Sequence, residues 1–164
     1  MCSLTLCPSL FQVIVYELTQ TDSDLKPTLV GLATWDRGYH LHTVRVRGEV
    51  IVTADALRSL DVLVWNGKSL SLRARDHSSL WPIAMETVDG ENIMVAEASP
   101  IFESSSLIIV ESVFKGQGNL FTYKVEGGLL DRIGTYHLGE RITSLQSGKC
   151  PNSRYDILVI PFFP

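Results

Sequence analysis

Two histidines set two positions apart are the chain's best candidate for a metal site. His40 and His42 stand in the segment HLH, and alternation along a strand would put both imidazoles on the same face, a spacing that metal ions can use. No third ligand is evident, since no pattern in the sequence places Asp36 or His77 beside them. We therefore expect no metal ion and no cofactor in this protein.

Motifs for catalysis or nucleotide binding are missing as well. The serines, histidines and aspartates include no GxSxG turn that would present a nucleophile. The glycines of GQGNLF, residues 116–121, do not follow the GxGxxG pattern that opens a helix under a phosphate. A hairpin turn explains that segment better. The residues give no reason to expect an enzyme.

Composition and charge narrow the class of protein further. The 164 residues are 45% hydrophobic and 20% charged, which is typical of a folded domain, and the formal net charge is −4. A chain with no basic field does not attract a phosphate backbone, so direct nucleic-acid binding is disfavoured. Three scattered cysteines indicate unpaired thiols in a reducing compartment, and no apolar run approaches the roughly 18 residues of a membrane span.

The elements that position any site are expected to be strands. Short runs rich in Val, Ile, Leu and Tyr follow one another along the chain, and turn residues separate them. Asn66-Gly67 between two apolar runs is the strongest hairpin signal. The runs span residues 11–18, 41–46, 50–54, 60–65, 69–74, 83–88, 93–96, 107–113, 119–125 and 130–137.

An internal repeat indicates how these strands are grouped. RGEVIVTADA at 47–56 returns as DGENIMVAEA at 89–98, with glycines at 48 and 90, an offset of 90 − 48 = 42 residues. That offset is close to the period of about 40 to 45 residues for a four-stranded propeller blade. The sequence therefore predicts an all-β fold, a partial β-propeller of about two four-stranded blades plus flanking strands. Residues 99–117 have no counterpart in the first copy and are predicted to be an insertion.

Several ordered segments resemble a known family. RGEVIVTADALRSLDVLVW, LSLRARDHSSLWPIAMETVDGENIMVAEA, GNLFTYKV and RIGTYHLGERITSL are similar to the C-terminal propeller region of the large subunit of UV-damaged DNA-binding protein. That family also includes the large subunit of the cleavage and polyadenylation specificity factor and a splicing-factor subunit. ARD at 74–76, Trp81 and YHLGE at 136–140 favour the damaged-DNA-binding branch. The resemblance assigns residues 10–146 to a partial C-terminal propeller domain.

The resemblance implies a scaffold rather than an enzyme. Members of this branch are nuclear proteins, also expected in the cytoplasm, that join a cullin ubiquitin ligase to interchangeable substrate receptors in DNA repair. Contact with damaged DNA is then expected to be indirect, through a receptor, with no membrane involved. The alternative is a scaffold in mRNA polyadenylation or splicing complexes.

Individual positions carry over from the family. Arg58, Arg75 and Trp81 match residues that line the receptor-binding cleft, and His42 lies on a strand that the resemblance places near it. Guanidinium groups can bond carbonyls or carboxylates of an incoming segment, and a Trp supplies a flat apolar anchor. For Arg75 and Trp81 a purely structural role at the blade edge is the alternative, and His42 is otherwise simply exposed.

The two ends of the chain depart from the family. Residues 1–9 and 147–164 do not resemble the expected neighbouring strands. We therefore expect the chain to be a fragment, with a nonfunctional truncated product as a further alternative. An arc of blades that does not close leaves apolar faces uncovered.

Overall fold

The computed structural model describes residues 4–9, 12–19, 27–78, 80–88, 91–97, 118–139, 142–148 and 156–161, and within these ranges every regular element is a β-strand. The strands are β1 (Leu4–Ser9), β2 (Gln12–Thr19), β3 (Thr28–Trp35), β4 (Leu41–Arg47), β5 (Val50–Asp55), β6 (Ser59–Trp65), β7 (Leu70–Arg75), β8 (Pro82–Thr87), β9 (Asn92–Glu97), β10 (Asn119–Glu126), β11 (Leu129–His137), β12 (Ile142–Gly148) and β13 (Asp156–Pro161).

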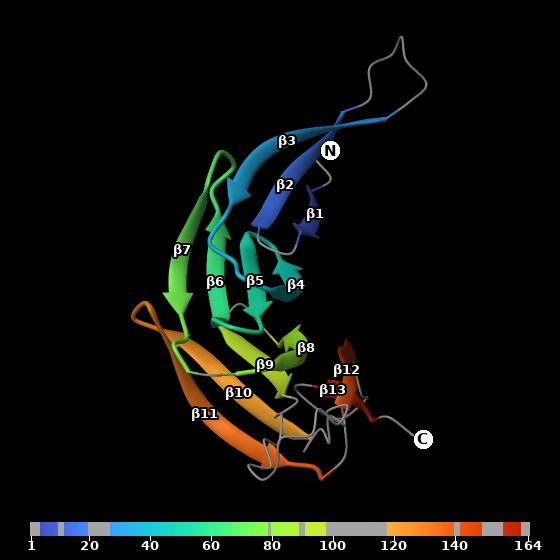
Figure 1. Cartoon of the computed structure of the whole chain (residues 1–164), viewed down its shortest axis with the longest axis vertical. Helices are drawn as coiled ribbons and strands as arrows, with labels where there is room; N and C mark the ends of the chain where they lie inside the picture. The colour runs from blue at the N-terminus through green and yellow to red at the C-terminus, as the bar shows by residue number, and fades with distance from the viewer. Residues whose placement is uncertain are drawn as a thin grey trace, which may run out of the picture.

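The strands form three hydrogen-bonded sheets, of three, eight and two strands, and the eight-stranded sheet consists of two four-stranded halves, so that four units follow one another in chain order as an arc (Figure 1). We call β1–β3 the N-terminal sheet, β4–β7 blade A, β8–β11 blade B, and β12–β13 the C-terminal sheet. Blades A and B are four-stranded meanders, and their hydrogen bonding meets only at one parallel bridge, between Arg75 of β7 and Leu129 of β11. The predicted fold, an all-β partial propeller of about two blades with flanking strands, is confirmed.

The 42-residue repeat corresponds to the second strands of the two blades. β5 begins at Val50 and β9 at Asn92, an offset of 92 − 50 = 42 residues. β9 pairs directly with β10, with Glu97 opposite Asn119, as β5 pairs with β6 across a three-residue turn. The predicted insertion at 99–117 and the predicted strand at 107–113 lie outside the described residues.

Apolar side chains fill each space between successive sheets. The continuous apolar runs of β5 and β6 are buried on both faces, because a central blade is covered on each side. One core therefore lies between the N-terminal sheet and blade A, a second between blades A and B, and a third between blade B and the C-terminal sheet. They contain, in that order, Val15, Ile51, Leu63 and Trp65; Val52, Leu60, Val62, Met85, Val95, Phe121 and Tyr123; and Ala84, Ala96, Leu120, Ile142 and Leu145.

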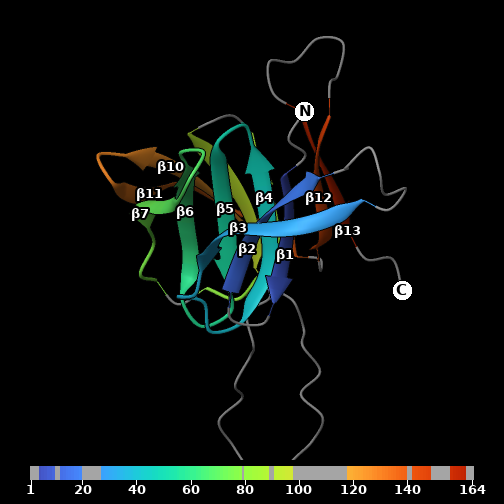
Figure 2. The same cartoon turned by 90° about the horizontal axis from the view of Figure 1, so that it is seen from above.

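The first strand of each sheet lies on the same side of the arc. β1 contacts β4, β4 contacts β8, and β8 contacts β12. In Figure 2, blade A runs across the view from β7 to β4, with β12 and β13 on the β4 side. Arg47 of β4 donates hydrogen bonds from Nη1 to the carbonyl oxygens of Thr87 and Val88, and its neighbour Arg45 forms an ion pair of 3.6 Å with Glu86 of β8. These polar contacts join the inner edges of the two blades.

Turn residues determine where the hairpins reverse. Asn66 accepts hydrogen bonds at Oδ1 from the amides of Lys68 and Ser69, at 2.9 and 2.8 Å, an arrangement that closes the β6–β7 hairpin. Gly127 and Gly128 join β10 to β11 with φ of 58° and 87°, a left-handed pair that other residues rarely adopt. The hairpin predicted at Asn66-Gly67 is confirmed.

The flanking sheets contain strands that the sequence patterns did not predict. β1, β3, β12 and β13 were not expected, and β12 crosses the predicted domain boundary at residue 146. The far end of the β2–β3 hairpin exposes large apolar side chains, as an open arc requires: Leu18, Leu29, Val30 and Leu32.

Candidate partner-binding surface

Three loops meet at one end of blade A. Residues 36–40 lead into β4, residues 56–58 join β5 to β6, and residues from 76 to 81, of which 79 is not described, connect β7 to β8. The amide of Ala56 donates to the His40 carbonyl, and the amide of Asp76 donates to the Leu60 carbonyl, each at 3.0 Å. We call these three loops the loop end of blade A.

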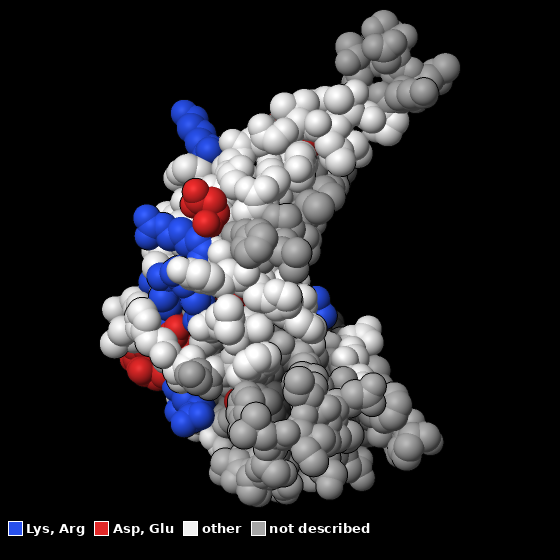
Figure 3. Space-filling view, in the orientation of Figure 1, with Lys and Arg blue, Asp and Glu red and all other residues white. Residues whose placement is uncertain are grey.

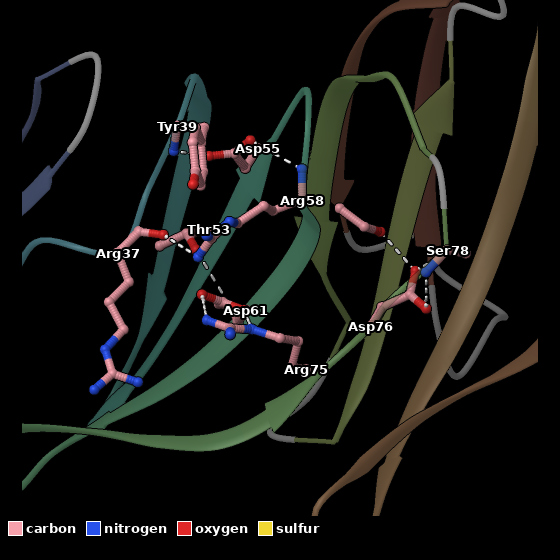
Figure 4. A network of polar contacts seen from close by, with 10 residues as sticks. Arg37, Tyr39, Thr53, Asp55, Arg58, Asp61, Arg75, Asp76 and Ser78 are labelled. Carbon is pink, nitrogen blue, oxygen red and sulfur yellow. Dashed lines mark hydrogen bonds and ion pairs between the residues drawn. The ribbon is translucent and has the colours of Figure 1, made fainter.

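The Asp55 carboxylate connects two of the three loops. Its side chain lies at the end of β5 with only 4% of the residue exposed. Oδ2 accepts from the amides of Tyr39 and His40 at 2.6 and 2.9 Å, and Oδ1 accepts from those of Leu57 and Arg58 at 2.8 and 3.0 Å. Figure 4 shows Asp55 between Tyr39 and Arg58. Burial acts to raise the pKa of Asp55, but these four hydrogen bonds outweigh it and hold the pKa below its usual 3.8.

Arg58 packs across the two loops that Asp55 connects. Its guanidinium carbon lies 4.0 Å from the centre of the Tyr39 ring, a close cation–π contact. Its Nη1 donates to the Arg37 carbonyl at 3.1 Å. Among the described residues, neither Arg37 nor Arg58 is ion-paired with a carboxylate. The remaining donors of Arg58 are therefore available to an acceptor on another molecule.

Arg75 differs from Arg58 because it has an internal partner. Its Nε and Nη2 bond the two carboxylate oxygens of Asp61 at 2.5 and 2.7 Å, and 19% and 10% of the Arg75 and Asp61 side chains are exposed. These hydrogen bonds raise the pKa of Arg75 above its ordinary value. The pairing favours the structural alternative for Arg75, while its predicted contact with a receptor stays a prediction.

A second carboxylate, half-buried, organises the 76–81 loop. Asp76 accepts hydrogen bonds from the Ser59 hydroxyl at 2.5 Å, from the Ser78 hydroxyl, and from the Ser78 amide at 3.1 Å. Burial acts to raise the pKa of Asp76, but these bonds keep it below 3.8. Ser59 has a φ of 68°, which is unusual for a residue with a side chain, and its hydrogen bond to Asp76 compensates part of that strain.

A buried tyrosine lies against this cluster. Tyr123 of β10 is 1% exposed, and its hydroxyl lies beside Asp76 without a properly formed hydrogen bond to any described residue. Burial, with the nearby Asp76 charge as the second cause, raises the pKa of Tyr123 to about 12. The polar cluster of blade A thus borders the core that it shares with blade B.

Each loop of the loop end exposes a large apolar or aromatic side chain. Tyr39, Leu57 and Trp81, one from each loop, are 50%, 65% and 38% exposed. Aromatic and Arg side chains are the types most enriched in binding hot spots. The loop end therefore combines exposed apolar side chains with an arginine that has no ion-pair partner among the described residues, a combination common in binding hot spots.

The predicted site residues are only partly gathered by the fold. Arg58 and Trp81 lie in loops of the loop end, and Arg75 ends the strand that leads into the third loop. The sequence analysis did not identify Tyr39 or Leu57 as site residues. Tyr39 could have been suspected, because it is an aromatic residue just before a predicted strand. The bonds of Asp55 to the Leu57 and Arg58 amides are of the short-range kind that Asp makes in turns, but no short-range pattern would have indicated its bonds to Tyr39 and His40.

The two histidines do not share a strand face as predicted. β4 begins at Leu41, so His40 precedes the strand, and the register shifts between Leu41 and Thr43, where His42 forms a bulge. Alternation therefore does not relate the two imidazoles. His42 is exposed, and in the described parts of the chain no group of three or more His, Cys, Asp or Glu side chains is placed to hold a metal ion.

Charged groups are mixed over the visible surface. Lys and Arg side chains follow the outer edge near β6 and β7 in Figure 3, with Asp and Glu among them. Among the described residues of this face, the basic side chains are thus interspersed with acidic ones, and the formal net charge of the chain is −4.

Successive four-stranded meanders of this kind are the blades of a β-propeller protein. A sequence model described as the CPSF A subunit region matches residues 10–159, and the chain belongs to that family. The resemblance predicted from the residues is thereby confirmed. The matched region begins at the predicted boundary and continues past residue 146 into β13.

Curated relatives of this chain are DNA damage-binding proteins of plants. It is 29% identical over 117 residues to DNA damage-binding protein 1a of Arabidopsis thaliana, and 28% identical over 125 and 117 residues to DNA damage-binding protein 1 of Oryza sativa subsp. japonica and of Solanum lycopersicum. Each match covers 68% of this chain and 10% of the relative. The chain thus spans about a tenth of the length of these relatives. In the described parts of this chain, no helix is long and apolar enough to cross a membrane.

Proposed function

We propose that this chain is part of a non-catalytic scaffold that acts in the response to DNA damage and binds other proteins through the loop end of blade A. The observation that carries the proposal is that Tyr39, Leu57 and Trp81 are exposed in the three loops of the loop end, where the Arg58 guanidinium packs on the Tyr39 ring. Family membership and relatives named for damaged-DNA binding support the setting.

The chemistry of the loop end favours a peptide segment as its ligand. An apolar side chain of the partner would pack against Trp81 and Leu57, and a carbonyl or carboxylate of the same segment would accept from Arg58. Exposed rim contacts contribute little, so the free energy of binding should concentrate in Trp81 and Arg58. Arg75 and His42 are proposed as secondary contacts at the edge of this surface.

In the complete protein, the proposed partners are substrate receptors and a cullin ubiquitin ligase, and the proposed location is the nucleus, with a cytoplasmic pool. Damaged DNA would be reached through a receptor, because the formal net charge of −4 and the mixed surface charges do not favour a phosphate backbone. We further propose that residues 10–146 are one propeller region with an insertion at 99–117, and that the chain is a fragment of a longer protein.

A second candidate function is a scaffold in mRNA polyadenylation or splicing complexes. It is favoured by the family description, which refers to a CPSF subunit region, whereas the curated relatives favour the first function. A truncated product with no function of its own is the remaining alternative.

Affinity purification of the full-length gene product distinguishes these candidates. Wild-type protein should recover cullin and receptor subunits, and the variants Trp81→Ala and Arg58→Ala should each lose receptor by more than about tenfold in affinity, equivalent to about 1.4 kcal/mol. Lys68→Ala, at the opposite end of blade A, is the matched control and should bind normally. Recovery of polyadenylation or splicing subunits instead would establish the second function and refute the first.

A further inference from the structure

We propose that Asp55 is a positioning residue, whose carboxylate places Arg58 on Tyr39 and so sets the geometry of the binding surface. The inference deepens the proposed function and rests on it for the role of that surface. Asp55 itself is 4% exposed, so it acts through the two loops and not by touching a partner.

The four hydrogen bonds of Asp55 are divided equally between the loops. One oxygen holds the 39–40 amides and the other holds the 57–58 amides. Among the described residues, the other hydrogen bonds between these loops run from the Ala56 amide to the His40 carbonyl and from the Arg58 guanidinium to the Arg37 carbonyl. The bond to the Arg37 carbonyl exists only when the Arg58 side chain is already in place. The Asp55 carboxylate is therefore the main link between the loops that does not depend on the Arg58 side chain.

Only a carboxylate of this length can make all four bonds. An Asn at position 55 offers one acceptor oxygen, and its NH2 group would face two backbone N–H donors. Whichever way the amide turns, one loop loses its support. The Tyr39 ring and the Arg58 guanidinium come from different loops. Their 4.0 Å contact should therefore be lost when either loop loses its hydrogen bonds to the side chain at position 55.

Solution NMR of the 164-residue chain tests the positioning step without any partner. In the wild type, the Tyr39 ring should shift the Arg58 side-chain signals upfield by its ring current. The variant Tyr39→Leu has no ring and gives the reference value for a complete loss of this shift. Asp55→Asn should lose most of this shift and accelerate amide exchange in one loop by tenfold or more. Gly134→Ala, a destabilising change in blade B, is the matched control and should preserve both. A full shift in a folded Asp55→Asn variant would overturn the proposal.

A wild-type measurement covers the case in which Asp55→Asn does not fold. The amides of Tyr39, His40, Leu57 and Arg58 lie in or beside loops, yet each should exchange at least tenfold more slowly than an unstructured amide. The amides of Lys68 and Ser69, held by Asn66 in the same manner, are the internal reference. Exchange of the four amides at unstructured rates beside a protected reference would refute the role of Asp55.

Receptor binding by the full-length product then separates this inference from the proposed function. Asp55→Asn should weaken receptor binding by about as much as Arg58→Ala, and the double variant should be no weaker than Arg58→Ala alone. Normal binding by Arg58→Ala would refute the proposed function while leaving the NMR result on Asp55 intact. Independent, additive losses in the double variant would contradict action through Arg58.

Discussion

The ion pair between Arg75 and Asp61 should be a major contribution to the stability of blade A. The pair is bidentate and mostly buried, with side-chain exposures of 19% and 10%. Removing one partner from a fully buried pair costs about 3–5 kcal/mol, because the other charge is left without compensation. Residual exposure of Arg75 lets water screen part of that penalty, so we expect about 2–3 kcal/mol for Asp61→Asn.

A double-mutant cycle measures this directly. Urea unfolding of the 164-residue chain, followed by circular dichroism, gives the free energy of unfolding for Asp61→Asn, Arg75→Gln and the double variant. The double variant should be less destabilised than the sum of the single changes, with a coupling energy of about 1.5–2.5 kcal/mol. Arg58→Ala is the matched control, since its cation–π contact with Tyr39 is worth only about 0.5–1 kcal/mol. Single-variant costs below about 0.5 kcal/mol, or additive costs, would refute a structural role for Arg75.

The remaining predictions concern the core and the buried acids. Tyr123→Phe should raise the free energy of unfolding by up to about 1 kcal/mol, because it removes a buried hydroxyl that lacks a proper partner. The pKa of Tyr123 rises from its ordinary value of 10.0 to about 12 in the folded protein, so the wild type should lose stability as the pH rises through this range. Tyr123→Phe should abolish this loss, and an alkaline transition that is unchanged in the variant would contradict the assignment to Tyr123. Gly134→Ala should cost about 1–3 kcal/mol, since an added Cβ would lie 2.3 Å from Thr122 Oγ1, and Thr122→Ala should recover much of that cost in thermal melts. Asp55 and Asp76 have lowered folded pKa values, so their stabilisation is present above 3.8 and lost as the pH falls through those lower values; a urea midpoint that stays constant on acidification from pH 5 to pH 2 would contradict this.

The sequence revealed the blades because their signals are local and repeated. Alternating apolar runs, glycine turns and the 42-residue offset together identified all eight strands of blades A and B. β3 was missed because Gly31 and Thr34 interrupt its apolar pattern, and it becomes a strand by pairing with β2. β12 and β13 likewise depend on each other, since their pairing joins residues on either side of the 149–155 segment.

The polar contacts of the site were harder to predict because they depend on register. At the hairpin end of the β6–β7 pair, Trp65 lies opposite Leu70, and this register, if it continued unchanged, would place Asp61 opposite Ala74. A register shift between Val62 and Leu63 brings Asp61 opposite Arg75 instead. The sequence does not mark this bulge. Arg75, which the family resemblance predicts to be a binding residue, therefore pairs with Asp61 because of this one-residue bulge.

Site-specific photo-crosslinking in the full-length gene product tests the central claim most directly. A photoreactive residue at position 57, which is 65% exposed in the loop end, should crosslink to a receptor or other scaffold partner. The same residue at position 68, in the hairpin at the opposite end of blade A, should give no such product. Partner crosslinks from position 68 and none from position 57 would contradict the assignment of the binding surface to the loop end.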